Sequence, residues 1–321
     1  MIKIALFCDP PVYGGGGGVY SYCISLKQML EESGDFSVTL FSDFKYKNIC
    51  GLNIFSMDTI KEKILEGKFD FIHINGFMTF LPYQLYFLLK RNKINIPIIY
   101  TPHAHPFYTL RHPNRNKLFY YCFNNKVIKQ SYKVICNNNE DYSFFSKKNK
   151  EARKIVEWYT IEPENIDIPK NFKRILFVGR NDSNKRLDFL YCLPKGKYEV
   201  VCITNKKPER DDFLYLHDLS KEELINEYKK SDLLVVPSKY ESFSLVTLES
   251  MCVGTPVLLS DRCRIIDWLG ETSGYSVFRY DDKDDFLSKI DKTMKQKIDT
   301  EYLKKVFSKE SALTQYREIY K

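Results

Sequence analysis

The chain has 321 residues, of which 44% are hydrophobic, and its net charge is +8 at pH 7. This length suits two α/β domains of ordinary size, each with its own core. The nine cysteines are scattered, without a C-x-x-C motif or a Cys/His cluster, which argues against a disulfide framework or zinc site and favours free thiols in a reducing cytoplasm. The opening apolar stretch is too short for a signal peptide, and the longest uncharged run, residues 71–89, contains His73 and Pro82 and fits a soluble strand, loop and helix better than a membrane span.

A glycine loop follows the first expected strand. Residues 2–7 predict a strand, residues 14–18 are five consecutive glycines, and a helix is expected from about 19 to 32. Such a loop lets the backbone approach a ligand closely, although a flexible turn is the alternative. The spacing is not G-x-G-x-x-G, and no acidic residue ends a clear second strand, so a dinucleotide site is weakly supported.

Two histidines lie in or after the next expected strands. His73 falls inside the predicted strand 69–75 and is interpreted as a packed core residue. His103 follows the predicted strand 96–100 in the sequence Thr-Pro-His. A histidine at a strand end can donate to a substrate hydroxyl or stabilise developing charge.

Residues 90–133 are basic and aromatic. No carboxylate occurs between Asp70 and Glu140, while nine lysines and arginines do. Anionic lipid head groups, a nucleic acid, or an ordinary solvated helix pair would each explain this composition.

A second α/β pattern begins after residues 161–170, a polar stretch with two prolines that predicts an interdomain linker. The strand 174–178 is followed by Gly-Arg-Asn-Asp-Ser-Asn-Lys-Arg. Arg180 and Lys185 at the carboxyl end of a strand can neutralise a diphosphate, Arg180 through a bidentate fork and Lys185 as a point charge.

The segment 233–259 predicts a β-loop-α-β unit. A buried strand over 233–236 leads through a polar loop to a helix from about Ser244 to Val253, and a second strand follows Gly254. The helix start favours an anion, and Glu241 and Glu249 could accept hydrogen bonds from hydroxyl groups on either side of it. Solvated helix-end charges are the alternative for these two glutamates.

This segment resembles the retaining GT-B glycosyltransferases of family 4. Their pattern is E-F-G-x-x-x-x-x-E followed by G-x-P-V, and this chain reads E-S-F-S-L-V-T-L-E and then G-T-P-V. Ser244 stands where glycine is usual and is expected to serve as the helix N-cap. The family's G-R-x-x-x-x-K-G is matched at Gly179, Arg180 and Lys185, with Arg186 in place of the last glycine, and its H-x-H segment is matched at His73, with Asn75 in place of the second histidine.

The resemblance implies two Rossmann-like domains facing a cleft. The first would span residues 1–160 together with a C-terminal crossover helix at 307–321 and would bind the acceptor. The second, residues 161–306, would bind a nucleoside-diphosphate sugar. We therefore expect a sugar to be transferred from a UDP- or GDP-sugar to a hydroxyl of a glycan or lipid-linked acceptor.

The resemblance also assigns roles to individual residues. Glu249 would bind the ribose, and Glu241 would contact the transferred sugar together with His103. The other expected donor-binding residues are Gly16, Gly17, Gly18, Arg180, Lys185, Leu216, Phe243, Ser244 and Leu245. Lipid-linked acceptors favour a membrane surface over a nucleic acid for residues 90–133, so a cytoplasmic, peripherally membrane-bound protein is expected.

No metal or other cofactor is expected. The one D-x-D match, Asp282-Lys283-Asp284, lies near the C-terminus, where carboxylates at a helix start are ordinary. Two rival functions stay open: a nucleotide-sugar epimerase or phosphorylase of the same fold, and a non-catalytic protein that binds membrane or nucleic acid through its basic face.

Overall fold

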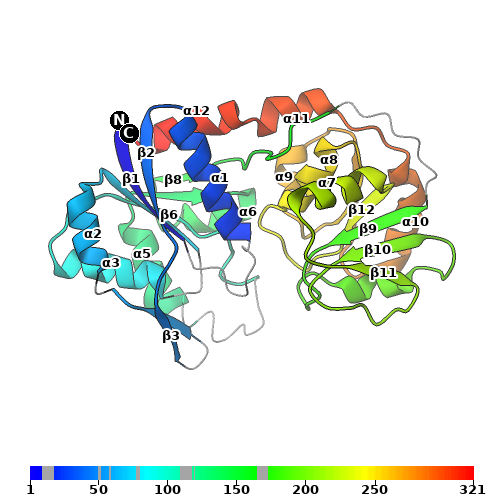
Figure 1. Ribbon diagram of the computed structural model, residues 1–321, viewed down its shortest axis with the longest axis horizontal. Coiled ribbons are helices and arrows are strands. Elements are labelled where there is room, and N and C mark those ends of the chain that lie inside the picture. Colours follow the sequence, from blue (N-terminus) through cyan, green and yellow to red (C-terminus); the bar gives the residue numbers. More distant parts are fainter. Residues whose placement is uncertain are drawn as a thin grey trace. The chain divides into compact units, whose positions relative to one another are not determined.

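The computed structural model describes residues 1–8, 18–49, 52–57, 59–76, 80–108, 118, 120–164 and 173–321 (Figure 1). The chain divides into two compact units. Unit 1 comprises Met1–Ile155 and Ala312–Lys321, and unit 2 comprises Val156–Ser311.

Unit 1 is built on a six-stranded sheet in the order β2-β1-β5-β6-β7-β8, and every pairing is parallel. Its strands are β1 (Ile2–Cys8), β2 (Phe36–Phe41), β5 (Phe71–Asn75), β6 (Ile98–Thr101), β7 (Lys133–Cys136) and β8 (Ala152–Lys154). The central strands β1, β5 and β6 read as nearly unbroken apolar runs because both of their faces are buried.

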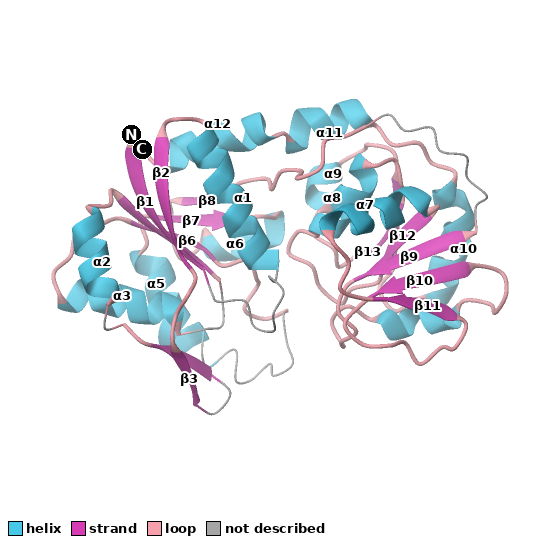
Figure 2. Cartoon of the chain, viewed as in Figure 1, coloured by secondary structure: helices cyan, strands magenta, loops and turns pink. Residues whose placement is uncertain are grey.

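Helices cover both faces of this sheet (Figure 2). One face packs against α2 (Ile60–Gly67), α3 (Leu81–Arg91) and α5 (Asn125–Gln130) through alternate strand residues such as Phe7, Ile74 and Tyr100. The other face carries α1 (Gly18–Glu32) and the C-terminal helix α12 (Lys309–Ile319), whose neighbour Tyr320 bonds to His73 of β5. Further helical segments in the described part of unit 1 include the π-helix η1 (Tyr120–Asn124) and α6 (Asn139–Phe145).

An antiparallel hairpin, β3 (Tyr46–Ile49) with β4 (Leu52–Phe55), was not expected from the sequence. It is fixed to α3 by the side-chain amide of Gln84, which accepts from the backbone N–H of Phe55 at 3.0 Å and donates to its carbonyl at 2.8 Å. A tertiary anchor of this kind leaves no mark in local sequence periodicity.

Unit 2 repeats the architecture with the order β11-β10-β9-β12-β13-β14, again all parallel. Its strands are β9 (Arg174–Val178), β10 (Glu199–Ile203), β11 (Phe213–Leu216), β12 (Leu233–Val236), β13 (Val257–Ser260) and β14 (Tyr275–Phe278). Its helices are η2 (Leu187–Cys192), α7 (Lys221–Lys230), α8 (Leu245–Cys252), α9 (Ile266–Leu269), α10 (Lys283–Met294) and α11 (Thr300–Phe307). One face packs against α7, α8, α9 and α11, and the other packs against η2 and α10.

Each sheet has a topological switch point, where two neighbouring strands send their connections in opposite directions along the sheet. In unit 1 it lies between β1 and β5, and in unit 2 between β9 and β12. In open parallel sheets, ligands bind beyond the carboxyl ends of the strands at this place. In unit 2, Arg180 and Lys185 follow β9 and Glu241 follows β12, and in unit 1 His103 follows β6, the strand next to β5.

The units divide a few residues away from the expected boundaries at 160/161 and 306/307. Val156 and Tyr159 pack into the core of unit 2, and the N–H of Tyr159 donates to the carbonyl of Phe307 at 3.0 Å. The apolar pattern of residues 154–159 also predicts a last strand for the first domain, but β8 ends at Lys154 and residues 155–159 belong to no strand. Part of the predicted linker, residues 165–170, lies outside the described residues.

Candidate functional site

The loops after β9 and β12 are joined directly to each other. Asn184 in the first loop accepts from the N–H of Lys239 at 2.7 Å through its carbonyl, and its side-chain amide donates to the carbonyl of Tyr240 at 3.0 Å. Asp182 shapes the first loop, since its Oδ1 accepts from the N–H groups of Asn184 and Lys185 at 3.0 Å each. The two loops at the switch point of unit 2 therefore form one hydrogen-bonded structure.

An ion pair crosses the switch point between these loops. Nζ of Lys185 lies 2.7 Å from Oε1 of Glu241, and the two side chains are only 20% and 14% exposed. The backbone of Glu241 is held separately, because its N–H donates to Arg262 at 3.2 Å and its carbonyl accepts from Arg264 at 2.9 Å. A half-buried pair of this kind holds an ammonium and a carboxylate at a defined place.

Arg180 is positioned differently from Lys185. Its guanidinium lies 3.3 Å from Oδ2 of Asp182, and its side chain is 69% exposed. The structure thus brings Lys185 together with Glu241 and leaves Arg180 on the surface of the same loop. An exposed side chain of this length can reorient when an anion binds.

Ser244 does not cap α8 as expected. The helix begins at Leu245, and Ser244 has φ 106° and ψ 78°, whereas an N-cap residue has extended backbone. Its hydroxyl bonds to Oγ1 of Thr247 at 2.8 Å instead of to a helix N–H. Positive φ is the region that glycine adopts readily, so this backbone position would suit the glycine of the resembling pattern without strain.

Arg186 also stands where the resembling pattern has glycine, and it too has a positive backbone φ. Its φ is 56°, and its side chain bonds to the hydroxyl of Tyr280 at 2.6 Å and to Asp281 at 3.0 Å. Phe189 and Tyr280 also lie under its guanidinium at 5.7 and 5.5 Å from the ring centres. These contacts offset the cost of about 1 kcal/mol or more that a side chain pays at positive φ.

Glu249 lies in the second turn of α8, where Tyr228 donates to its Oε2 at 3.0 Å. Burial raises the pKa of this carboxyl above its ordinary value, while the hydrogen bond from Tyr228 and the charge of Lys221 oppose the rise. Its proton affinity is therefore sensitive to what binds beside it.

Three further expected donor-binding residues take part in the core of unit 2. Phe243 is 4% exposed, and its ring lies edge to face with Phe307 at 6.1 Å, so its side chain is occupied by packing. Leu245 and Leu216 are half-buried against the same core. The carbonyl of Leu216 accepts from the N–H of Thr204 at 3.1 Å.

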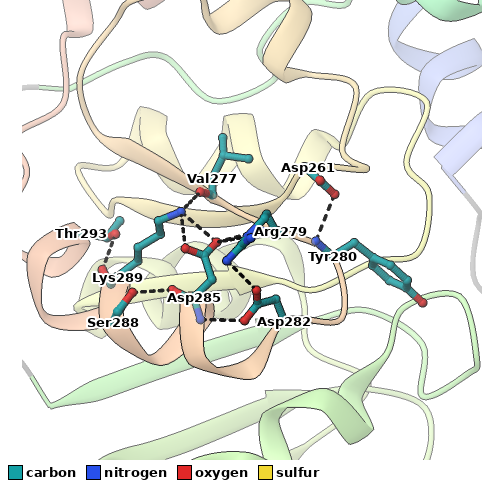
Figure 3. A network of polar contacts seen from close by, with 9 residues as sticks. All are labelled: Asp261, Val277, Arg279, Tyr280, Asp282, Asp285, Ser288, Lys289 and Thr293. Carbon is teal, nitrogen blue, oxygen red and sulfur yellow. Dashed lines mark hydrogen bonds and ion pairs between the residues drawn. The ribbon is translucent and has the colours of Figure 1, made fainter.

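The D-x-D match is a helix start, as interpreted from the sequence (Figure 3). Asp282 is the N-cap of α10 and accepts from the N–H of Asp285 at 2.9 Å. Its other oxygen pairs with Arg279 at 2.8 Å, and Asp285 pairs with Lys289 at 2.9 Å. Within the described ranges, no group of three or more His, Cys, Asp or Glu side chains could hold a metal ion.

In unit 1, His103 is hydrogen-bonded to Asn75, which was not expected from the sequence to be a site residue. Its Nε2 lies 2.9 Å from Oδ1 of Asn75, the last residue of β5, and its ring lies edge to face with Tyr22 of α1 at 4.5 Å. Burial lowers the pKa of His103 to about 3, so the imidazole is neutral at physiological pH. The backbone φ of His103 is 58°, in the left-handed region that non-glycine residues seldom adopt.

His73 is a core residue, as expected. Its Nδ1 and Nε2 bond to the hydroxyls of Tyr320 and Thr101 at 2.6 and 2.8 Å, and burial lowers its pKa to about 3. Tyr316 of α12 bonds to the hydroxyl of Tyr22, the residue whose ring touches His103. The C-terminal helix thus supports both histidines, a link across more than 200 residues that sequence spacing does not reveal.

Two of the expected glycines, Gly16 and Gly17, lie outside the described residues, and Gly18 is the first residue of α1. A Cβ added to Gly18 would meet no atom within 4 Å. The described structure therefore gives no steric need for glycine at position 18.

Comparisons with known proteins find similar sequences and folds. Residues 193–309 match the family described as glycosyl transferases group 1. The chain is 25% identical over 305 residues to an uncharacterized 41.2 kDa protein in the cps region of Klebsiella pneumoniae, covering 84% of this chain and 85% of that protein. Over 110 residues it is 46% identical to D-inositol 3-phosphate glycosyltransferase of Mycolicibacterium smegmatis, which is 28% of this chain and 25% of that protein.

Two solved structures superpose over nearly the whole chain. Sucrose-phosphate synthase from Thermosynechococcus elongatus has a TM-score of 0.75 at 16% identity and covers 100% of this chain and 98% of its own. HepE from Anabaena in complex with UDP and glucose has a TM-score of 0.67 at 13% identity, with 99% of each chain covered.

The chain thus has the GT-B fold and is a glycosyltransferase. The match to glycosyl transferases group 1 lies in unit 2 and includes Glu241, Glu249 and the helix α8 between β12 and β13.

Proposed function

We propose that the chain transfers a sugar from a nucleoside-diphosphate sugar to a hydroxyl group of a glycan or a lipid-linked acceptor. We further propose that it belongs to family 4, that the anomeric configuration is retained, and that no metal ion is needed. Unit 2 would bind the donor. The proposal is supported by the group 1 match in unit 2 and by the structural similarity to a protein solved with UDP and glucose.

The ion pair between Lys185 and Glu241 is the observation that carries this proposal. It places a cation at the switch point of unit 2, where a diphosphate would lie beyond the ends of β9 and β12. Arg180, on the same loop and 69% exposed, can add a bidentate contact to that diphosphate. Two cations and a helix start would then stabilise the leaving diphosphate in place of a metal ion.

Glu249 is proposed to bind the ribose. A carboxylate accepts hydrogen bonds from two neighbouring hydroxyls, and Tyr228 holds this carboxylate from one side at 3.0 Å. Glu241 is proposed to contact the transferred sugar. Its backbone, bonded to Arg262 and Arg264, keeps the carboxylate near the strand ends when Lys185 turns to the phosphates.

A thermal-shift screen with UDP, GDP and ADP in EDTA tests the donor site. A diphosphate at ~100 times its dissociation constant should stabilise the protein by about 2.7 kcal/mol. Glu249→Gln should remove most of this shift, while Glu222→Gln, an exposed carboxylate at the start of α7, should keep it. No shift with any diphosphate, or the same shift in Glu249→Gln, would count against the proposed site.

Product analysis separates transfer from the rival chemistry. A transferase needs an acceptor hydroxyl, whereas an epimerase converts the donor alone. NMR of the anomeric proton reports whether the configuration is kept. Inversion of the configuration, or activity lost in EDTA and restored by Mg²⁺, would contradict the corresponding part of the proposal.

The acceptor side of the proposal concerns an exposed surface of unit 1, here called the basic aromatic surface. Its exposed residues are Phe87, Lys90, Arg91, Leu118, Tyr121, Lys126 and Lys129. The elements that carry all of these residues except Leu118 are adjacent, since Phe123 of η1 lies edge to face with Tyr83 of α3 at 4.9 Å and α3 contacts α5. Large apolar side chains interleaved with cations suit an anionic lipid surface.

Two parts of the basic stretch 90–133 do not contribute to this surface as described. Lys133 is buried, and its Nζ donates to the carbonyls of Glu318 and Ile319 at the end of α12 at 2.8 and 2.9 Å. Arg111, Arg115 and Lys117 lie outside the described residues. No helix in the described part of the chain combines the length and apolarity needed to cross a membrane.

Vesicle flotation tests the basic aromatic surface. Binding to vesicles with anionic lipid, weaker binding to neutral vesicles and a further loss in Lys126→Glu/Lys129→Glu would support it. Equal binding to both kinds of vesicle, or preferential binding to RNA, would overturn the membrane assignment. Peripheral binding at a cytoplasmic membrane face belongs to the same proposal.

A further inference from the structure

Asn75 occupies an unusual place beside His103. It ends β5 next to the switch point of unit 1, its side chain is fully buried, and its Oδ1 lies 2.9 Å from Nε2 of His103. Its Nδ2 has no hydrogen-bond partner among the described residues. Leaving both N–H donors of a buried amide nitrogen unpaired is costly unless the bond made by its oxygen matters.

The chemistry of this contact determines where the imidazole proton lies. A carboxamide oxygen only accepts hydrogen bonds, so Nε2 of His103 must carry the proton. A neutral imidazole has one proton, which leaves Nδ1 as an acceptor. Among the described residues, Nδ1 of His103 has no hydrogen-bond partner.

Burial keeps the ring neutral. Tyr22 from α1 presents its ring at 4.5 Å, and the pKa of nearby His73 is lowered by burial and, to a smaller extent, by His103. The second histidine is itself neutral and bonded to Tyr320 and Thr101. Asn75 completes this set with an uncharged acceptor, so no described ion pair reaches His103.

We infer that Asn75 is a positioning residue that fixes His103 as the neutral Nε2–H tautomer, so that Nδ1 accepts a hydrogen bond from a substrate hydroxyl. The role of the tautomer in transfer rests on the proposed function, whereas the tautomer itself does not. This differs from the expectation that His103 donates to the substrate, because its single proton is already committed to Asn75.

The tautomer is measured directly by long-range ¹H–¹⁵N NMR on the full chain labelled at its five histidines. The signal of His103 is assigned by its loss in His103→Gln. The inference requires a protonated Nε2 and an unprotonated Nδ1 across pH 5 to 8. A protonated Nδ1, or an imidazolium in this range, would overturn it.

Asn75→Leu removes the acceptor and Asn75→Asp keeps it while adding charge. In Asn75→Leu the fraction of Nε2–H tautomer should fall, with a decrease in kcat of about fivefold, the factor that one hydrogen bond supplies. KM for the donor should stay the same. A kcat unchanged in Asn75→Leu despite a changed tautomer would overturn the positioning role.

Asn75→Asp sharpens the test through pH. A carboxylate at this place favours the imidazolium, so the pKa of His103 should rise and transfer should decline as pH falls, because a protonated Nδ1 no longer accepts. Thr101→Val is the matched control, since it removes the equally buried bond to His73 at 2.8 Å. It should lower stability without changing the His103 signal, and a change there equal to that in Asn75→Leu would refute the specific role of Asn75.

Failure of the proposed function gives a different result. If the chain transfers no sugar, the NMR signals still report the tautomer and its dependence on Asn75. If transfer occurs with the predicted donor but His103 carries its proton on Nδ1, only the present inference is wrong.

Discussion

The two units place loops at the carboxyl ends of sheets of the same size, but the side chains there differ in kind. In unit 2 the switch point holds ion pairs, Lys185 with Glu241 and Arg180 with Asp182. In unit 1, His103 is neutral and lies between a carboxamide and a tyrosine ring. Charged groups suit a diphosphate, while a neutral imidazole suits hydroxyl groups, so one architecture supports two kinds of recognition.

Among the substitutions that test this difference between the units, Lys185→Ala should have the largest effect on activity. It removes a cation from the proposed diphosphate site and leaves Glu241 half-buried without its ion partner. We expect kcat/KM to fall by roughly 10²- to 10³-fold, as when a preorganised donor is removed from an active site. Lys195→Ala, which breaks an exposed pair 3.4 Å from Asp211, is the control, and equal losses in both variants would refute the charged role of unit 2.

Glu157→Gln should reveal a pH response confined to unit 2. Burial raises the pKa of Glu157 from 4.5 to about 8, so the folded state holds a proton that the unfolded chain releases. The contribution of Glu157 to the free energy of unfolding is fully present below pH 4.5 and decreases as pH rises towards 8. At pH 7 the decrease is roughly 3 kcal/mol. Glu157→Gln should remove that loss.

The response can be followed by tryptophan fluorescence, because Trp158 and Trp268 both lie in unit 2. Urea midpoints at pH 5 and 7.5 should differ less in Glu157→Gln than in the unsubstituted chain. Glu271→Gln, an exposed carboxylate of the same unit, should behave like the unsubstituted chain. Parallel midpoints in all three proteins would show that Glu157 ionises normally.

Unit 1 should respond to pH in the opposite sense. Burial lowers the pKa of His73 from 6.5 to about 3, so the unfolded state binds the extra proton between these values. The contribution of neutral His73 to the free energy of unfolding is fully present above pH 6.5 and decreases as pH falls towards 3. At pH 5 the decrease is about 2 kcal/mol. Circular dichroism should therefore show acid unfolding that tryptophan fluorescence does not, and coincident transitions would contradict the separate behaviour of the units.

Substitutions of Ser244 should cause the smallest changes in the free energy of unfolding. Ser244→Ala loses the bond to Thr247 and keeps the positive φ, so it should destabilise the protein by about 1 kcal/mol. Ser244→Gly loses the same bond but relieves a cost of about 1 kcal/mol, so it should be nearly neutral. At Ser288, inside α10, the order should reverse, because glycine is about 1 kcal/mol worse than alanine in a helix.

The sequence predicted strands of unit 2 because the relevant signals are local, whereas the binding roles of its site residues remain predictions. The predicted strands 174–178 and 233–236 match the structure to the residue. The helix expected from about 19 to 32 is observed as Gly18–Glu32. Apolar runs and caps act within a few residues of the chain, so they can be read without tertiary information.

The parts that the sequence did not predict depend on distant residues. Nothing near Asn75 indicates that its amide lies beside His103, because the contact joins the ends of two strands. Ser244 looked like a cap because its residue type is common at caps, yet the surrounding loop imposes a positive φ. Tertiary context decided each of these cases against local preference.

The discontinuous composition of unit 1 also has a consequence for synthesis. Tyr316 and Tyr320 come from residues 312–321, and they complete the buried face that holds Tyr22 and His73. A ribosome makes these residues only after all of unit 2, so unit 2 can fold while unit 1 still lacks part of its core. The nascent chain must therefore keep an unfinished apolar surface from aggregating until α12 has been synthesised.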